Sequence, residues 1–164
     1  NTKFANMERI ALFPGSFDPF TAGHLNILSR ALTMFDRVVV AAGVNQDKRG
    51  FYDTQQKVNI IREATAGVSD RVDVISYDCL TIEICRQLGI RHIVRGVRNM
   101  LDFENERAIA DANRRLAPEI DTIIIPTAQE YAHISSSAVR DILRHNGDTS
   151  MFTVPGVKLP EVRR

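Results

Sequence analysis

The sequence predicts an α/β protein built on a doubly wound, five-stranded parallel sheet. Five short runs of almost wholly apolar, largely β-branched residues recur along the chain, and such runs are typical of parallel strands that are covered on both faces. Segments with apolar residues at helical spacing separate the runs, so strands and helices alternate throughout. The length of 164 residues is that of a single domain, and one sheet therefore accounts for all five strands.

The first half of the chain supplies three of the strands and two of the helices. Each expected strand stops at a glycine, a proline or a polar residue, and each expected helix begins near a side chain that can cap it. In order, the expected elements are a strand over 9–13 that stops at Pro14-Gly15, helical spacing across 25–35, a strand over 38–42, a helix capped by Asp53 or Thr54, and a strand over 72–75.

The second half continues the same alternation. Gly89 suits the position just past a helix end, and Pro118 marks the end of the longest helix. In order, the expected elements are a helix over 82–88, a strand over 92–94, a helix over 100–116, a strand over 122–125 that stops at Pro126, and a last helix capped by Ser136 or Ser137. The tail after Ser150 contains Pro155 and Pro160 and is expected to be short and irregular.

Composition and charge exclude several classes of protein. The chain is 44% hydrophobic and 25% charged, which are values of a folded globular protein rather than a disordered one. Lys and Arg number 21 against 20 Asp and Glu, and this balance does not favour a nonspecific nucleic-acid binder. The longest apolar run, 38–44, is too short to span a membrane. Two cysteines, Cys79 and Cys85, do not make a disulfide framework, so we expect a reducing, cytoplasmic location.

The first seven residues differ in character from the rest of the chain. They are polar and show no period, and Met7 has the character of a natural start. We expect 1–7 to be a remnant of expression together with that start, and 8–164 to form one domain. No signal-peptide pattern opens the chain.

In doubly wound sheets, ligands bind beyond the carboxyl ends of the strands, so the segment after the first strand is the first candidate site. That segment, 14–24, contains neither the dinucleotide fingerprint nor a P-loop. It carries a hydroxyl at Ser16 and then Thr21-x-Gly23-His24 at the start of a helix. The N–H groups and dipole of such a helix start suit a phosphate. The alternative is that Thr21 merely caps the helix and His24 is a surface residue, but the whole string favours the phosphate site.

Three further strand ends carry polar or charged groups. They are the loop 45–51 with Lys48, the block 95–98 with the acidic stretch 102–106 after it, and the serine-rich segment 131–140. Each has an ordinary explanation when taken alone: a solvated lysine, a solvated helix face, and a cap that needs only one serine. At the shared edge of one sheet, however, they would surround a phosphorylated ligand.

These four segments together resemble a known family. Thr21-x-Gly23-His24 matches the T/H-x-G-H signature of the nucleotidyltransferase α/β phosphodiesterase superfamily. The preceding string Pro-Gly-Ser-Phe-Asp-Pro over 14–19, the R-G-x-R…D-F-E-x-E block and the I-S-S-x-x-[IV]-R motif are similar to those of bacterial phosphopantetheine adenylyltransferases. That family more often has threonine where this chain has Ser16, and both keep the hydroxyl. The resemblance runs from about residue 8 to 155 and implies a Rossmann-like nucleotidyltransferase fold.

The resemblance also implies a role for each matching residue. His24 would stabilise the transition state, and Lys48 and Arg98 would also be catalytic. The residues that would bind ATP are Ser16, Phe17, His24, Gly96, Val97, Arg98, Glu106, Tyr131, Ala132, His133, Ile134, Ser135, Ser136 and Ser137. Those that would bind the phosphopantetheine substrate are Ser16, Lys48, Thr81 and Arg95. Mg²⁺ would be bound through the ATP phosphates, with no metal ligands from the protein.

The implied reaction, a step of coenzyme A biosynthesis, joins ATP to 4′-phosphopantetheine and gives dephospho-coenzyme A and pyrophosphate. The attacking group is the acceptor's own phosphate, which is ionised at neutral pH and needs no general base. This agrees with the matched motifs, which hold no Ser-His-Asp order and no nucleophilic cysteine. The family also implies a homohexamer of two stacked trimers and feedback by coenzyme A.

Two other functions remain open from the sequence. One is adenylyl transfer to a different phosphorylated acceptor, such as nicotinamide mononucleotide. Lys48 and the R-G-x-R…D-F-E block favour phosphopantetheine over that acceptor. The other is a nucleotide-sensing module without turnover, which would have no need of His24 and Lys48.

Overall fold

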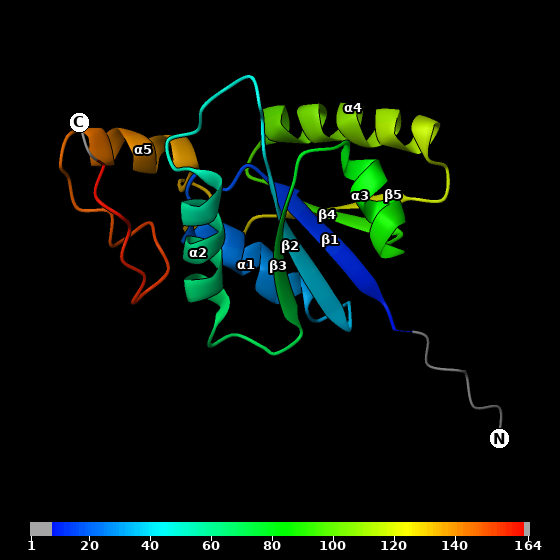
Figure 1. Cartoon of the computed structure of the whole chain (residues 1–164), viewed down its shortest axis with the longest axis horizontal. Helices are drawn as coiled ribbons and strands as arrows, with labels where there is room; N and C mark the ends of the chain where they lie inside the picture. The colour runs from blue at the N-terminus through cyan, green and yellow to red at the C-terminus, as the bar shows by residue number, and fades with distance from the viewer. Residues whose placement is uncertain (1–7, 163–164) are drawn as a thin grey trace.

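The computed structural model describes residues 8–162. The expected remnant at 1–7 lies outside the described residues. Five parallel strands form one sheet in the order β3-β2-β1-β4-β5, and helices pack on both of its faces (Figure 1). The predicted doubly wound α/β architecture is therefore confirmed.

Strands and helices alternate along the chain as the sequence predicts. The strands are β1 (Ile10–Gly15), β2 (Arg37–Gly43), β3 (Val72–Tyr77), β4 (His92–Val97) and β5 (Asp121–Pro126). The helices are α1 (Ala22–Ala31), α2 (Thr54–Thr65), α3 (Thr81–Leu88), α4 (Met100–Leu116) and α5 (Ser136–Arg144), with a 3₁₀ turn, η1, at Gln129–Tyr131.

The central strand β1 divides its side chains between two hydrophobic clusters. Ala11 and Phe13 point to the face that α1 and α2 cover, whereas Leu12 points to the opposite face, where α3 contributes Ile82 and Cys85. Successive side chains of a strand point to opposite faces, so a strand buried on both sides must be apolar throughout. The apolar runs of the sequence are a consequence of this arrangement.

Two helix boundaries differ from those the sequence predicts. Helix α1 ends at Ala31, although Leu32 and Phe35 continue its spacing. Both side chains remain buried after the helix has ended. Their apolar character therefore reflects burial in the core and not helical structure. The N-cap of α5 is Ser135, whose hydroxyl accepts from the N–H of Ala138, and the expected cap at Ser136 or Ser137 is wrong.

Other predicted ends are confirmed. Asp53 caps α2 in a capping box with Gln56. Gly89 ends α3 in the left-handed conformation with φ of 68°, which glycine adopts without steric cost. No helix in the described residues is long and apolar enough to cross a membrane.

The sheet opens between β1 and β4. The β1–β2 ladder pairs six residues, whereas the β1–β4 ladder pairs only Ala11 with His92 and Leu12 with Ile93. The two strands lead to helices on opposite faces, so this is the switch point at which doubly wound sheets bind ligands. A crevice therefore forms beyond the carboxyl ends of β1 and β4.

Candidate active site

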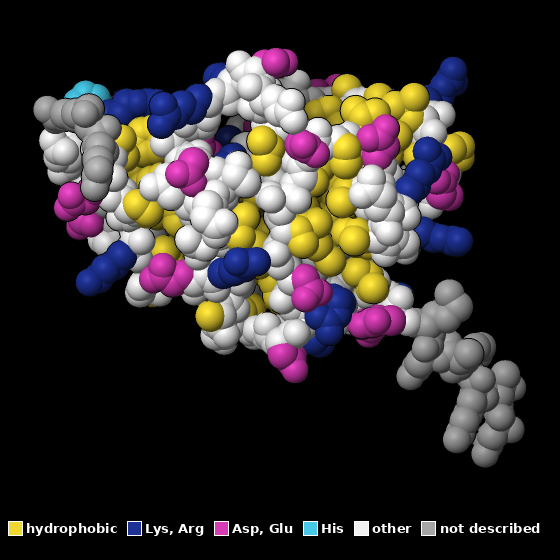
Figure 2. Space-filling view, in the orientation of Figure 1, with side chains coloured by type: hydrophobic (Ala, Val, Ile, Leu, Met, Phe, Trp, Pro, Cys, Tyr) yellow, Lys and Arg dark blue, Asp and Glu magenta, His cyan; other side chains and the backbone are white. Residues whose placement is uncertain are grey.

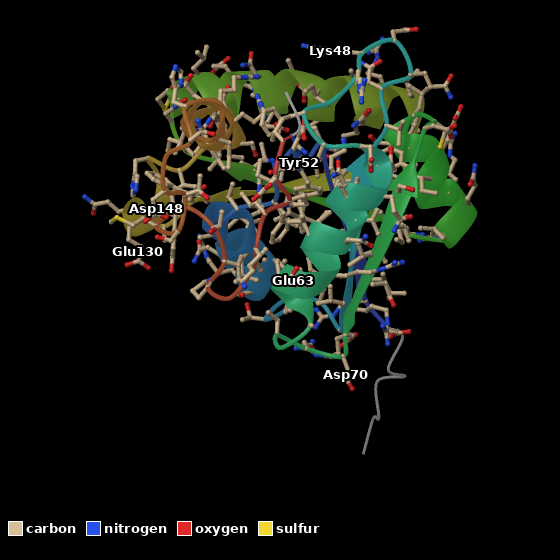
Figure 3. All side chains as sticks on the ribbon, turned by 60° about the vertical axis from the view of Figure 1, so that its left-hand side comes forward. Lys48, Tyr52, Glu63, Asp70, Glu130 and Asp148 are labelled. Atoms are coloured by element: carbon tan, nitrogen blue, oxygen red, sulfur yellow. The ribbon has the colours of Figure 1, made fainter. Side chains whose placement is uncertain are left out.

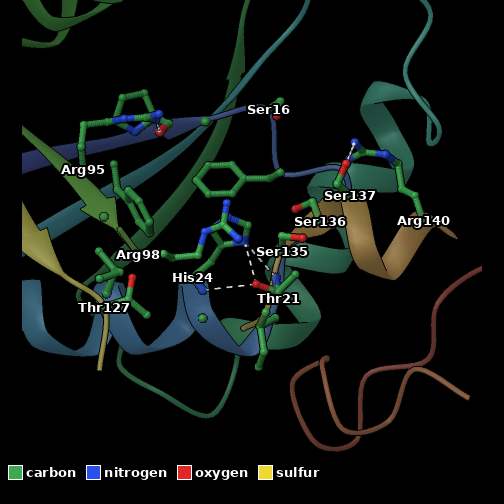
Figure 4. A pocket seen from close by; sticks show the side chains of 18 residues that line it. Ser16, Thr21, His24, Arg95, Arg98, Thr127, Ser135, Ser136, Ser137 and Arg140 are labelled. Atoms are coloured by element: carbon green, nitrogen blue, oxygen red, sulfur yellow. Dashed lines mark hydrogen bonds between the residues drawn. The ribbon is translucent and has the colours of Figure 1, made fainter. Parts of the chain in front are cut away.

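A pocket of about 320 Å³ occupies this crevice, and we call it the central pocket (Figure 4). Its walls come from the loop after β1, the first turn of α1, the end of β4 and the first turn of α5. The lining residues are Phe13, Pro14, Gly15, Ser16, Phe17, Thr21, Gly23, His24, Ile27, Arg95, Gly96, Arg98, Thr127, Ile134, Ser135, Ser136, Ser137 and Arg140. Four segments far apart in the sequence thus meet at one site.

The first turn of α1 fixes the orientation of His24. Thr21 is the N-cap, and its hydroxyl accepts from the backbone N–H of His24 at 3.4 Å. In return, the backbone N–H of Thr21 donates to Nδ1 of His24 at 2.9 Å. A backbone N–H can only donate, so Nδ1 carries no proton and the proton of the neutral ring is on Nε2. The capping box therefore leaves Nε2–H as the ring's donor toward the pocket.

The surroundings of His24 keep its ring neutral. Three phenyl rings lie around it, with centroids 6.4 Å away for Phe13, 5.0 Å for Phe17 and 5.3 Å for Phe20. Burial, and then the positive charges of Arg95 and Arg98, lower the pKa of His24 to about 3. Each cause disfavours the imidazolium. At neutral pH, His24 is thus a hydrogen-bond donor without a charge.

The first turn of α5 forms a second helix N-terminus at the pocket. The hydroxyl of Ser136 donates to the carbonyl of Pro19 at 2.8 Å and ties this turn to the loop after β1. Arg140, one turn further along, donates to the carbonyl of Asp18 at 2.8 Å and to the hydroxyl of Ser137 at 3.3 Å. Two helix N-termini therefore border one pocket, an arrangement that favours phosphate groups.

Each of the two arginines at the end of β4 is paired with a carboxylate of α4. Arg95 holds Glu106 through two bonds, of 2.6 and 2.8 Å, and also donates to the carbonyl of Pro14. Arg98 lies 3.2 Å from the carboxylate of Asp102, one helical turn away. The Arg95 pair is bidentate and partly buried, which fixes the guanidinium plane at the end of β1.

A second pocket of about 440 Å³ adjoins the central one, and we call it the side pocket. The two pockets share Pro14, Gly15, Ser16 and Arg95. The side pocket is more apolar, with Leu80 and Ile109 in its wall. Thr81 also lines it and shares a hydrogen bond of 3.0 Å with the Tyr77 hydroxyl. An elongated acceptor could thus lie here with its charged end at Ser16 and Arg95.

The structure brings most of the predicted site residues together. Those lining the central pocket alone of these two are Phe17, His24, Gly96, Arg98, Ile134, Ser135, Ser136 and Ser137, while Ser16 and Arg95 line both pockets and Thr81 and Glu106 line the side pocket alone. The predicted residues outside both linings are Lys48, Val97, Tyr131, Ala132 and His133. The roles in ATP binding expected for Glu106, Val97 and Tyr131–His133 stay predictions.

Lys48 lies apart from the other predicted residues. It is exposed at the outer part of the loop between β2 and α2 (Figure 3). It lines a third hollow, which also includes Ser16 and Arg140. Its predicted contact with the attacking phosphate therefore depends on the reach of a long, exposed side chain, and it too stays a prediction.

Sequence reasoning gave no role to three residues that organise the site. Arg140 closes the serine motif and lines the central pocket, and Thr127 leads from β5 into the same pocket. Buried Asp18 accepts from the N–H groups of Phe51 and Tyr52 at 2.7 and 2.9 Å and so holds the loop that carries Lys48. The position of Arg140 in its motif was a usable signal, whereas Asp18 acts across more than thirty residues of sequence.

A neutral imidazole donor and two helix N-termini at the switch point of a parallel sheet define a nucleotidyltransferase. The cytidylyltransferase-like family model matches residues 12–142. The chain is 44% identical to the phosphopantetheine adenylyltransferase of Bacteroides fragilis over 92% of this chain and 99% of that protein. It is 45% identical, with the same coverage, to the phosphopantetheine adenylyltransferase of Flavobacterium psychrophilum. The chain belongs to the phosphopantetheine adenylyltransferase family.

A solved structure supports the fold. It is a bifunctional NMN adenylyltransferase/ADP ribose pyrophosphatase from Francisella tularensis, with a TM-score of 0.70 at 18% identity. The match covers 90% of this chain and 45% of that longer chain. At this identity, the likeness concerns the shared nucleotidyltransferase fold.

Proposed function

We propose that this protein transfers the adenylyl group of ATP to 4′-phosphopantetheine and forms dephospho-coenzyme A and pyrophosphate, a step of coenzyme A biosynthesis. One observation carries the proposal: the neutral, Nε2-protonated ring of His24 faces a pocket bordered by two helix N-termini. Such a pocket suits the α-phosphate of a nucleotide. The adjoining side pocket suits an extended acceptor whose phosphate lies at Ser16 and Arg95.

The reaction is a displacement at phosphorus. An oxygen of the acceptor phosphate forms a bond to the α-phosphorus of ATP, and the bond from that phosphorus to the bridging oxygen breaks, so that pyrophosphate leaves with the electron pair. The acceptor phosphate is ionised at neutral pH, and no protein base takes a proton. The protein therefore contributes position and charge stabilisation.

The residues divide these tasks by location. His24 donates Nε2–H to a nonbridging oxygen of the α-phosphate, where charge grows in the transition state. Ser16, Lys48 and Arg95 hold the attacking phosphate. Arg98 and the first turn of α5 stabilise the phosphates of the leaving group.

Mg²⁺ enters as part of the nucleotide substrate. A Mg²⁺ ion that keeps most of its waters and binds triphosphate oxygens needs few protein ligands or none. In the described residues, no three His, Cys, Asp or Glu side chains gather in a way that could hold a metal. Glu106, which lines the side pocket, is engaged by Arg95.

Assembly, regulation and location complete the proposal. A homohexamer of two stacked trimers would cover α4, where no residue is buried and where Met100 and Leu101 are 74% and 72% exposed. Coenzyme A, which contains the product, would compete for the same two pockets. The protein would act in the cytoplasm.

A release assay tests the function. Pyrophosphate is measured with ATP and 4′-phosphopantetheine together, with each alone, and with nicotinamide mononucleotide as acceptor. We expect release only with ATP and 4′-phosphopantetheine. Release with ATP and nicotinamide mononucleotide, but not with ATP and 4′-phosphopantetheine, would assign a different acceptor. No release with either acceptor would support a nucleotide sensor.

A further inference from the structure

The chain between the end of β5 and the N-cap of α5, residues 126–135, lies against α1, and we call it the connecting segment. In the last turn of α1, the guanidinium of Arg30 donates to the carbonyl of Pro126. One turn earlier, the side chain of Asn26 accepts from the backbone N–H of Ala128 at 3.4 Å. Residues four apart in a helix share one face. Two side chains on one face of α1 therefore hold the start of the connecting segment.

The contacts continue toward the N-terminus of α1. A Cβ at Gly23 would lie 3.8 Å from the carbonyl of Tyr131 and 4.0 Å from the Cβ of Ile134. The connecting segment thus follows α1 from its last turn to its first, where His24 lies. The residue after Ile134 is Ser135, the N-cap of α5. The course of the segment along α1 therefore decides where the second helix N-terminus stands at the central pocket.

The held part of the connecting segment forms a wall of the central pocket. Thr127 lies between the two residues that α1 holds, and it lines the pocket. Its N–H donates to the carbonyl of Val97 at 2.8 Å, directly before Arg98 in the chain. Three consecutive residues thus each give one backbone group to α1 or β4. Figure 4 shows Thr127 on one side of His24 and the serines 135–137 on the other.

Arginines hold the walls of the central pocket at three places. Arg95 donates to the carbonyl of Pro14, and Arg140 donates to the carbonyl of Asp18. Arg30 does the same for the last residue of β5. Arg95 and Arg140 line the pocket and can also touch a ligand, whereas Arg30 does not line it. An effect of Arg30 on a ligand must therefore act through the connecting segment.

Solvation or an ion pair is the ordinary explanation of an exposed arginine. On the face that Figure 2 shows, Lys and Arg side chains are spread over the surface with Asp and Glu side chains among them. Arg86 is an exposed arginine of this kind, and its guanidinium lies 2.6 Å from the carboxylate of Glu119. Arg30 is exposed as well, but it pairs with no carboxylate in residues 8–162. Its partner is a backbone group of the pocket wall.

We propose that Arg30 and Asn26 are positioning residues for the bound nucleotide. They fix the connecting segment along α1, so that Thr127 and the first turn of α5 keep their places relative to His24. The identity of the nucleotide as ATP rests on the proposed function, whereas the hold on the segment rests on these contacts. No residue of the connecting segment lines the side pocket. Loss of either contact should therefore weaken binding of ATP and leave binding of the acceptor unchanged.

Calorimetric titration of the full chain with ATP tests the proposal at Arg30. Arg30→Met removes the donor and keeps an unbranched side chain, and we expect ATP to bind about fivefold more weakly, as for loss of one hydrogen bond. Arg30→Lys keeps a donor and should bind ATP more tightly than Arg30→Met. Arg62→Met is the matched control, because Arg62 also lies exposed in the last turn of a helix and the helix dipole acts on both.

Amide hydrogen exchange tests the same hold one turn away and needs no ligand. Asn26→Ala removes the acceptor of the Ala128 N–H, and we expect exchange at Ala128 to accelerate about fivefold. Binding of ATP should weaken in this variant too, whereas binding of 4′-phosphopantetheine should match the wild type in every variant. Asn59→Ala, at an exposed position of α2, is the control and should change neither exchange at Ala128 nor binding.

Four results would overturn the proposal. They are unchanged binding of ATP in Arg30→Met and Asn26→Ala, an equal loss in Arg62→Met, an equal loss of ATP and 4′-phosphopantetheine binding, and no binding of ATP by the wild type. If Asn26→Ala fails to fold, Arg30→Met at its exposed position carries the test. Wild-type turnover is measured separately. The expected changes in ATP binding without turnover would support the two positioning residues and reject the proposed function.

Discussion

The backbone N–H of Thr21 donates to Nδ1 of His24 at 2.9 Å, and this contact sets which ring nitrogen is the donor at the central pocket. The same contact is half of the capping box that starts α1. The two interpretations of Thr21-x-Gly23-His24, a helix cap and a phosphate donor, are therefore compatible. The cap is present, and it is what leaves Nε2–H free to meet a phosphate.

Removal of the His24 donor should slow chemistry more than it weakens binding. We expect His24→Ala to lower kcat by about 10²–10³-fold, the range for loss of one preorganised donor to a developing charge. The ATP Kd should change little, because the other groups of the pocket remain. Single-turnover kinetics and calorimetry separate the two effects. Near-normal turnover would remove the transition-state role of His24.

The protonation state of His24 predicts two effects of pH. The ring should remain neutral from pH 5 to 8, because burial and the neighbouring arginines lower its pKa to about 3. A histidine in an unfolded chain has an ordinary pKa of about 6.5. As pH falls below 6.5, the unfolded chain takes up a proton that the folded protein does not, so stability is lost progressively toward pH 3.

Nitrogen NMR of the free protein checks the first effect, and the His24→Gln variant assigns the signal. A titration of this ring near pH 6.5 would contradict the neutral donor. Urea unfolding between pH 4 and 7 checks the second effect, and the slope of stability against pH should be shallower in His24→Gln. Each pKa unit of difference corresponds to about 1.4 kcal/mol.

The strands could be predicted from the sequence, because a strand covered on both faces must be apolar over its whole length. The end of α1 could not. Leu32 and Phe35 are buried after the helix has ended, and spacing alone does not distinguish a buried turn from a helix. The cap of α5 was misplaced because three adjacent serines are chemically equivalent. Their partners distinguish them in the fold: Ser135 accepts from the N–H of Ala138, Ser136 donates to the carbonyl of Pro19, and Ser137 accepts from Arg140.

The site was predictable where a motif places a residue at a strand end, as for His24. It was not predictable where a distant segment closes over a residue. Asp18, for example, accepts from the backbone N–H groups of Phe51 and Tyr52, which lie more than thirty residues further along the chain. Pairing between such distant segments leaves no local pattern in the sequence.

Asp18 should hold the loop between β2 and α2 in place. In Asp18→Asn, one of the two carboxylate acceptors is lost, and we expect a decrease of about 1–3 kcal/mol in the free energy of unfolding. Amide hydrogen exchange at Phe51 and Tyr52 should accelerate. Asp47→Asn, in the exposed part of the same loop, is the control and should change neither property. Wild-type exchange at Phe51 and Tyr52 in Asp18→Asn would reject this role.

Gly96 should be required by the close approach of β4 to α1. A Cβ at this position would lie 2.7 Å from Cγ1 of Ile27, so in Gly96→Ala the Ile27 side chain or one of the two elements must shift. We expect a loss of about 1–3 kcal/mol in stability. Combined with Ile27→Ala, the loss should be smaller than the sum of the two single losses. Gly67→Ala, which meets nothing within 4 Å, is the neutral control. If the two losses are additive, the contact between positions 96 and 27 does not cause the instability of Gly96→Ala.

The two cysteines should differ sharply in reactivity, and that difference locates the acceptor. Cys79 lines the side pocket and is partly exposed, whereas Cys85 is fully buried and burial raises its pKa to about 11. The thiolate is the reactive form, so we expect a disulfide reagent to label Cys79 about a hundredfold or more faster than Cys85. Because the side pocket should hold the pantetheine arm, 4′-phosphopantetheine should slow labelling of Cys79 and ATP alone should not. The Cys79→Ser variant should lose the fast phase and retain its fold. Protection by ATP but not by 4′-phosphopantetheine would place the nucleotide in the side pocket and reverse the assignment of the two pockets.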